Sequence, residues 1–135
     1  MYQQMIFVNL PVNDIDASRT FFTELGYSIN AQFSDETTAS VVISDTIVVM
    51  LLAREKYAEF TKKEIADATK TSEVLIALSA ESREKVDELV DKALAAGGTA
   101  AGETQDLGFM YGRSFDDLDG HTFEVVWMDP AAVEG

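Results

Sequence analysis

An internal repeat of one strand, one helix and three further strands is the feature that most constrains the fold of this chain. The first copy begins with an alternating strand at 5–12, and Asn13 or Asp14 can cap the helix that Gly26 ends. Three more strand signals follow before residue 53. They lie at Tyr27–Phe33, Thr38–Ser44 and Thr46–Leu52. This order predicts an α+β module in which the helix covers one face of a sheet.

The same order of elements returns in the second half of the chain. A strand is predicted at Glu73–Ser79, and Ser79 or Ser82 can cap the next helix. That helix carries apolar residues three and four apart, which places them on one stripe, and Gly97 stops it. The stripe consists of Val86, Leu89, Val90, Ala93 and Leu94. The last three strands are predicted at Thr99–Glu103, Phe109–Phe115 and His121–Met128.

We expect the whole chain, residues 1–135, to form one domain of two modules, because its length suits a single domain. Module one spans about 5–53 and module two about 72–128. A charged linker with a short helical piece occupies about 54–71, and 129–135 is a loose tail. Each module leaves one sheet face without a helix, and two such faces must curl into a cleft or be covered.

Composition excludes several kinds of site and partner. The chain has no cysteine, which removes disulfides, thiolate metal sites and cysteine nucleophiles, and it has one histidine, His121. A net charge of −14 repels nucleic acid and anionic membranes, so we expect neither as a partner. The acidity serves solubility first, although it also suits a cationic ligand. With no signal-peptide pattern and no apolar run of roughly 18 residues, we expect a cytoplasmic protein.

The last predicted strand contains a carboxylate, Glu124, within an apolar run. Carboxylates are rarely buried unless they are paired or act as ligands. Strand alternation places Glu124 on one face with Thr122 and Val126, pointing into the cleft. The opposite face should pack under a helix and carries His121, Phe123, Val125 and Trp127. Glu124 is therefore a ligand anchor, a general base, or a structural partner of Arg113 or a lysine. The preceding segment, Asp116–Gly120, is interpreted as a β-turn rather than a calcium loop.

Other candidate residues carry open alternatives. Asn9, on the strand face that carries Phe7, can fix a ligand through its amide or bond a neighbouring backbone group. Tyr111 and Arg113 share one strand face, which either lines the cleft and suits an anionic or aromatic ligand, or faces outward. Met50 is an adaptable pocket wall or a core residue. No phosphate-binding glycine loop and no Ser/His/Asp triad is recognisable.

Two local motifs, together with the repeat, resemble the vicinal oxygen chelate superfamily, which includes glyoxalase I, bleomycin resistance proteins, extradiol dioxygenases and fosfomycin resistance enzymes. One motif is Val12-Asn13-Asp14 leading into Ser18-x-x-Phe21-Phe22 and Leu25-Gly26. The other is Asp117-x-Asp119-Gly120-His121-x-x-Glu124. The resemblance covers essentially the whole chain. It implies two modules that curl their strands into a half-open, barrel-like sheet with a cleft.

The resemblance also implies where metal ligands would stand. The last-strand ligand is typically Glu, which Glu124 matches, whereas Phe7 occupies the place of the typical first-strand His. Leu75 aligns with the ligand position in the second module's first strand, and Val49 or Met50 aligns with the remaining one. A divalent metal needs about three or four protein ligands. We therefore expect no glyoxalase-type metal site and no cofactor.

The expected function is binding of a small organic molecule in an apolar cleft, as bleomycin-resistance-like relatives bind by sequestration. One alternative is a lyase or isomerase of the lactoylglutathione lyase type, with an altered metal site or with Glu124 as general base. Another is an interaction protein whose pocket has lost its function. Because relatives commonly dimerise, we expect a homodimer. The predicted ligand-binding residues are Phe7, Asn9, Met50, Leu75, Tyr111, Arg113 and Glu124.

Overall fold

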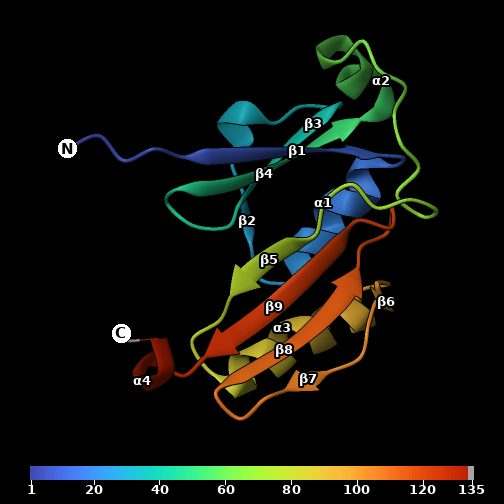
Figure 1. The fold of residues 1–135 in the computed structure, drawn as a ribbon. Helices are drawn as coiled ribbons and strands as arrows, with labels where there is room; N and C mark the ends of the chain where they lie inside the picture. Colours follow the sequence, from blue (N-terminus) through green and yellow to red (C-terminus); the bar gives the residue numbers. More distant parts are fainter. Residues whose placement is uncertain (134–135) are drawn as a thin grey trace. The chain divides into compact units, whose positions relative to one another are not determined.

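The chain folds into two compact units, Met1–Asp67 and Ala68–Gly135, in a computed structural model that describes residues 1–133. Each unit contains one sheet and a helix that packs against it (Figure 1). The predicted α+β class with two β-α-β-β-β modules is therefore confirmed. No helix in the described part of the chain is long and apolar enough to cross a membrane.

Unit 1 has a four-stranded sheet in the order β1-β4-β3-β2, with β1 parallel to β4 and the other pairs antiparallel. The helix α1 begins where Asp14 accepts a hydrogen bond from the amide of Ala17, and Gly26 follows it with φ +107°. The elements of the sheet and its helix in unit 1 are β1 Ile6–Val12, α1 Ile15–Glu24, β2 Ser28–Ile29, the 3-10 turn η1 Ala31–Phe33, β3 Thr38–Val42 and β4 Ile47–Ala53.

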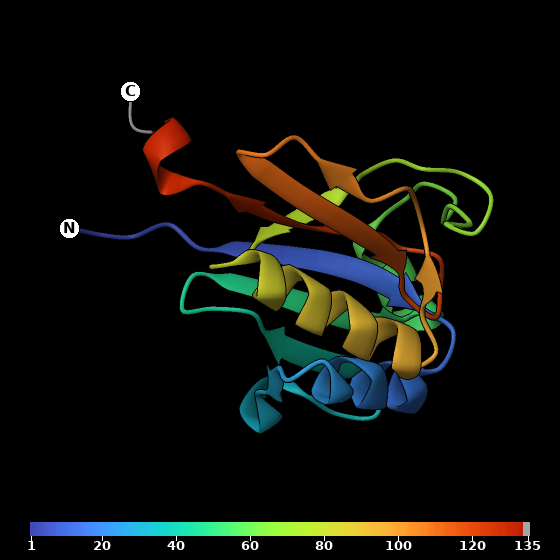
Figure 2. The ribbon, with the colours of Figure 1, turned by 90° about the horizontal axis from the view of Figure 1, so that it is seen from below.

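The core of unit 1 lies between α1 and one face of this sheet. Phe21 and Phe22 of α1 are buried in edge-to-face contact, with ring centroids 5.1 Å apart. Alternate strand residues, including Val12, Val41 and Val49, are completely buried. The residues between them on each strand point to the other face of the sheet. Residues 1–4 extend away from the sheet and are exposed (Figures 1 and 2).

Unit 2 has its sheet in the order β5-β9-β8-β6, with the short β7 pairing β8. As in unit 1, the first strand is parallel to the last, and α3 contacts β8 and β9. Ser82 caps α3 by accepting from the amide of Lys85. The elements of unit 2 are β5 Ile76–Ser79, α3 Arg83–Ala95, β6 Thr99–Ala100, β7 Gln105–Asp106, β8 Met110–Asp116, β9 Thr122–Met128 and α4 Pro130–Val133.

Several predicted boundaries were wrong. The strand expected at Tyr27–Phe33 contains only β2, because the Asn30 side chain caps the turn η1 by accepting from the amide of Gln32 at 3.1 Å. The strand expected at Thr99–Glu103 is reduced to β6. The linker carries α2 Arg54–Tyr57 and the 3-10 turn η2 Ala58–Phe60, as expected of a short helical piece.

The tail expected at 129–135 contains the short helix α4, and residues 134 and 135 lie outside the described part.

Candidate ligand pocket

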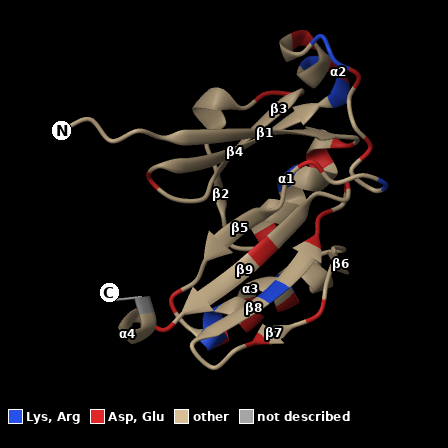
Figure 3. Cartoon of the chain, viewed as in Figure 1, with Lys and Arg blue, Asp and Glu red and all other residues tan. Residues whose placement is uncertain are grey.

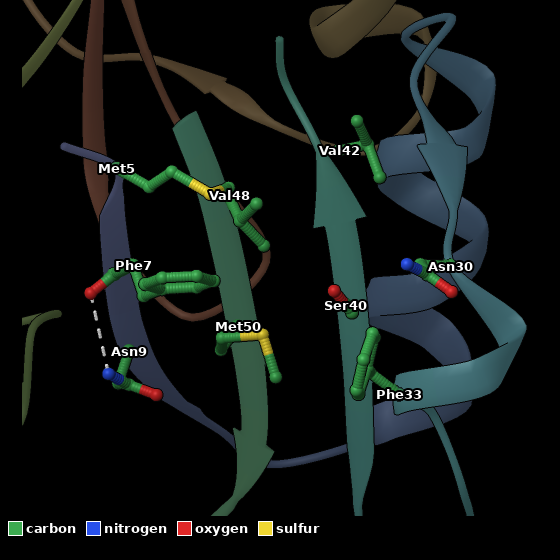
Figure 4. A pocket seen from close by; sticks show the side chains of 9 residues that line it. All are labelled: Met5, Phe7, Asn9, Asn30, Phe33, Ser40, Val42, Val48 and Met50. Carbon is green, nitrogen blue, oxygen red and sulfur yellow. Dashed lines mark hydrogen bonds between the residues drawn. The ribbon is translucent and has the colours of Figure 1, made fainter. Parts of the chain in front are cut away.

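A pocket of about 360 Å³ lies within unit 1, mostly on strand residues that alternate with the completely buried Val41, Val49 and Leu51. Its size is at the lower end of the range for small-molecule sites, roughly 300–1,000 Å³. Side chains from β1, β4, β3 and the segment around η1 form it (Figure 4). They are Met5, Phe7, Asn9, Asn30, Phe33, Ser40, Val42, Val48 and Met50. Phe33 extends the wall from η1.

The strand register arranges part of this lining as a row across the sheet. Asn9 pairs with Met50, and Ser40 pairs with Met50 from the other side. The backbone amide of Asn30 donates to the backbone carbonyl oxygen of Ser40 at 2.8 Å, so Asn30 extends this row by one more position. We call Asn9, Met50, Ser40 and Asn30 the polar row. Three of its four side chains can form hydrogen bonds, and none of them is charged.

A second row, parallel to the first, is entirely apolar. Val48 pairs with Phe7 on one side and with Val42 on the other. We call Phe7, Val48 and Val42 the apolar row. The Phe7 side chain is 56% exposed, so an occupant of the pocket would remove apolar surface from water.

The two asparagines of the polar row offer different groups to an occupant. The Nδ2 atom of Asn9 donates to the carbonyl oxygen of Phe7 at 3.5 Å, so its Oδ1 remains an acceptor (Figure 4). The Oδ1 atom of Asn30 accepts from the amide of Gln32, so its Nδ2 remains a donor. Ser40 adds a hydroxyl group between them. The strands β1, β3 and β4 contain no charged residue, as Figure 3 shows.

The structure brings together three of the residues predicted from the sequence: Phe7, Asn9 and Met50 all line this pocket. Sequence reasoning missed the other six lining residues, most of which are apolar and gave no chemical signal. Ser40 and Val42 could have been found, because they alternate with the buried Ala39 and Val41 along β3.

The remaining predicted residues, Leu75, Tyr111, Arg113 and Glu124, lie in unit 2. Leu75 is exposed just before β5. Tyr111 and Arg113 were expected to lie on a strand face that either lines the cleft or points outward. The structure corrects both alternatives. Their face of β8 is turned toward α3, where the hydroxyl of Tyr111 donates to Asp87 Oδ1 at 2.7 Å. Arg113 donates to the same oxygen at 2.9 Å.

These bonds have an electrostatic consequence within unit 2. The hydrogen bonds from Tyr111 and Arg113 lower the pKa of Asp87. Arg113 also donates to Asp91 at 3.0 Å, so two carboxylates of α3 neutralise one guanidinium. Both side chains are therefore engaged in holding α3 on the sheet, which removes them from the candidate site.

Glu124 points away from α3, as the alternation of β9 predicted. Its neighbours Phe123 and Val125 are completely buried, and it stands opposite Ser114 of β8 and Ala77 of β5. Arg113 pairs with Val125 in the register and so belongs to the other face. This excludes the structural pair between Glu124 and Arg113, and it leaves a half-buried carboxylate on the sheet face without a helix.

The segment before β9 is a tight turn, as predicted. The amide of Gly120 donates to the carbonyl oxygen of Asp117 at 3.2 Å, and Gly120 has φ +88°. The Asp117 side chain is 6% exposed and accepts from the amides of Asp119 and His121, both at 2.9 Å. Burial nevertheless raises the pKa of Asp117 to about 6, against the opposing effects of His121 and these bonds.

The donor groups present do not fit the metal that the superfamily resemblance implies. Across residues 1–133, no three His, Cys, Asp or Glu side chains form a group that could hold a metal ion. The pocket offers amides, a hydroxyl, thioethers and aromatic rings, whereas a divalent ion needs several carboxylate or imidazole ligands.

Comparison with known proteins identifies relatives of this fold. The profile of the bleomycin resistance protein-like N-terminal family matches residues 4–44. A hypothetical protein from S. aureus is 33% identical, with 94% of this chain and 95% of that chain covered and a TM-score of 0.77. No curated protein matches the chain.

Two more distant solved structures share the fold. A glyoxalase/bleomycin resistance protein/dioxygenase family enzyme from Burkholderia phytofirmans is 20% identical, with coverage of 93% and 99% and a TM-score of 0.75. A fosfomycin resistance protein from Listeria monocytogenes is 18% identical, with coverage of 94% and 94% and a TM-score of 0.67. At these identities the likeness is one of fold.

Proposed function

Because this chain belongs to the vicinal oxygen chelate superfamily, we propose that it binds a small organic molecule in the pocket of unit 1 without transforming it. The observation that carries this proposal is the chemistry of the lining. All nine lining residues are apolar or neutral polar, so none is a carboxylate, imidazole or amine that could move a proton. Such a site can hold and orient a molecule.

The exposed apolar side chains of the pocket supply the affinity. Phe7 and Phe33 are 56% and 59% exposed, which is unusual for large aromatic residues. Each 100 Å² of apolar surface that a ligand covers contributes about 2.5 kcal/mol before the costs of association. The polar row would then fix the orientation of the bound molecule.

A fragment screen by NMR tests this function. Methyl-labelled methionine reports from Met5 and Met50 in the pocket, while Met110 and Met128 of unit 2 serve as internal controls. We expect some small aromatic fragments to shift the two pocket methyl signals and to be recovered chemically unchanged. A Val42→Phe variant, which fills the pocket, should abolish those shifts. A broad fragment set that leaves both pocket signals unmoved would refute the proposal.

Metal retention provides an independent check. The protein is incubated with Zn²⁺, Ni²⁺, Mn²⁺ or Fe²⁺, desalted and assayed for bound metal. We expect no stoichiometric retention, because the lining lacks the necessary ligands. Tight stoichiometric metal that Glu124→Ala abolishes would favour a metalloenzyme instead.

A second candidate function rests on Glu124, which is half-buried on the helix-free face of the sheet in unit 2. A carboxylate in such a position could act as general base in a lyase or isomerase. Turnover of the methylglyoxal–glutathione adduct is the corresponding assay, and we expect none. Turnover that Glu124→Gln removes would establish this second function.

A further inference from the structure

We propose that the ligand of this pocket is an uncharged, flat aromatic molecule of about two fused rings with hydroxyl, carbonyl or amide groups along its length. This inference rests on the proposed function and specifies the class of molecule that the site takes. It follows from the two rows of lining residues, from the spacing of the groups that can form hydrogen bonds, and from the charges around them.

The apolar row favours a flat ring system. Phe7, Val48 and Val42 lie on three adjacent strands, and neighbouring strands are about 4.8 Å apart. The row therefore forms an apolar surface about 10 Å wide. Figure 4 shows the Phe7 ring extending from β1 toward β4, above Met50. A planar ligand can contact the whole row at once and stack on an aromatic side chain.

The polar row sets the length of the ligand and the positions of its polar groups. Asn9 and Asn30 stand at its two ends, three strand spacings or about 14 Å apart. Two hydrogen bonds of about 2.8 Å leave about 8 Å between the ligand's own polar atoms. Two fused rings with a group at each end span that distance.

The side-chain atoms of Asn9 and Asn30 that remain available also define which polar group the ligand carries at each of its ends. Asn9 retains an acceptor oxygen, so it favours a donor such as a hydroxyl group. Asn30 retains a donor nitrogen, so it favours an acceptor such as a carbonyl or hydroxyl oxygen. Ser40 can serve as donor or acceptor between them.

The absence of charge in the pocket lining excludes ionic molecules from the proposed class of ligand. No lining residue can pair with an ion, and an unpaired ion loses its hydration when it enters an apolar site. The net charge of −14 further opposes the approach of anions. A cation would be attracted over a distance, but the pocket lining holds no carboxylate to receive it.

Four probes of matched shape test the inference: 2,6-dihydroxynaphthalene, naphthalene, 2-naphthoate and 2-naphthylmethylammonium. The full chain is titrated with each probe while the methyl signals of Met5 and Met50 are followed. We expect 2,6-dihydroxynaphthalene to bind at least about tenfold more tightly than either charged probe. The signals of Met110 and Met128 should not move.

Two variants test the polar row directly. Asn9→Leu and Ser40→Ala should each weaken binding of 2,6-dihydroxynaphthalene several-fold and leave the affinity for naphthalene unchanged or higher. Retained binding of naphthalene at Met5 and Met50 verifies that unit 1 is folded in each variant. Equal losses for both probes would refute the role of the polar row.

The outcomes separate this inference from the proposed function. Tighter binding of a charged probe at Met5 and Met50 would overturn the inference and leave small-molecule binding intact. If none of the four probes moves either signal while fragments of another class do, the inference alone fails. If neither these probes nor the fragment set moves them, the proposed function fails as well.

Discussion

Two glycines that both have a positive φ have very different surroundings. Gly120 has φ +88°, and a Cβ atom there would stand 2.8 Å from backbone atoms of Ala68 and Thr69. Gly26 has φ +107°, but a Cβ atom there would meet nothing within 4 Å. The first position is constrained by conformation and by space, the second by conformation alone.

Alanine substitution should separate these two effects. We expect Gly120→Ala to lower the free energy of unfolding by roughly 2–4 kcal/mol, because the backbone around Ala68 must move. Gly26→Ala should cost only about 1 kcal/mol, the conformational penalty of a positive φ. Urea denaturation of both variants measures the difference, and equal losses would contradict the proposed contact.

The buried carboxyl of Asp117 predicts an unusual pH dependence. Its pKa is raised from 3.8 to about 6, with burial as the main cause and Asp119 adding to it, while His121 acts in the opposite direction. The folded protein therefore holds this proton more tightly than the unfolded chain does. The contribution of Asp117 destabilises the fold above pH 6, and this penalty is lost as the pH falls from about 6 to below 3.8.

Asp117→Asn isolates this contribution. The amide oxygen can still accept from the amides of Asp119 and His121, but the side chain no longer titrates. Between pH 7 and pH 4, wild-type stability should rise relative to the variant by on the order of 2 kcal/mol. Urea titrations across this range provide the comparison. Parallel pH profiles for the two proteins would show that Asp117 titrates normally.

At the scale of the elements, one side chain of α3, that of Arg83, links this helix to β7 and to the turn that follows β7. Arg83 donates to both carboxylate oxygens of Asp106 at 2.8 Å and to the carbonyl oxygen of Gly108 at 2.9 Å. Its guanidinium also lies 5.0 Å from the ring centroid of Tyr111 and 5.3 Å from that of Trp127. The paired bonds from Arg83 lower the pKa of Asp106 to about 2.

Arg83→Lys keeps the charge and removes the forked geometry. We expect the pKa of Asp106, followed by NMR, to rise toward its ordinary value of 3.8. Amide exchange at Gly108, which donates to Asp106, should become several-fold faster. Lys92→Gln is the matched control on the same helix, because the ammonium of Lys92 forms its ion pair with the exposed Glu88 and not with Asp106. An unchanged pKa of Asp106 in Arg83→Lys would contradict this account.

Local patterns predicted the elements well wherever a cap and a stripe agreed. Asp14 and Ser82 cap α1 and α3, and Val86, Val90 and Ala93 are buried as the stripe indicated. The partners of Arg113 could not be predicted from the sequence. Asp87 is 26 residues away, and its approach to Arg113 depends on how α3 packs on the sheet.

The pocket was predictable only in part for a similar reason. The alternation of β1 identified Phe7 and Asn9 as outward-facing residues. Which residues of β4 and β3 lie beside them depends on the pairing of β4 with β1 and with β3, and that register is a tertiary property. Asn30 was hidden within a predicted strand, although it caps a turn.

For the whole molecule, assembly and location remain predictions. We expect a homodimer, because strands at the edges of open sheets need covering. Light scattering at micromolar concentration should give about twice the chain mass of 14.8 kDa. A particle of the chain mass would contradict the prediction. The expected cytoplasmic location awaits fractionation of cells that express the protein.

The two faces of the unit 1 sheet respond differently to mutation. Mutations at inward positions such as Val41 and Val49 disturb a core that is completely buried. Mutations at outward positions such as Asn9 and Met50 change what the pocket contacts without opening that core. The lining of the pocket can therefore change through substitutions on alternate residues of three strands while the buried core is kept.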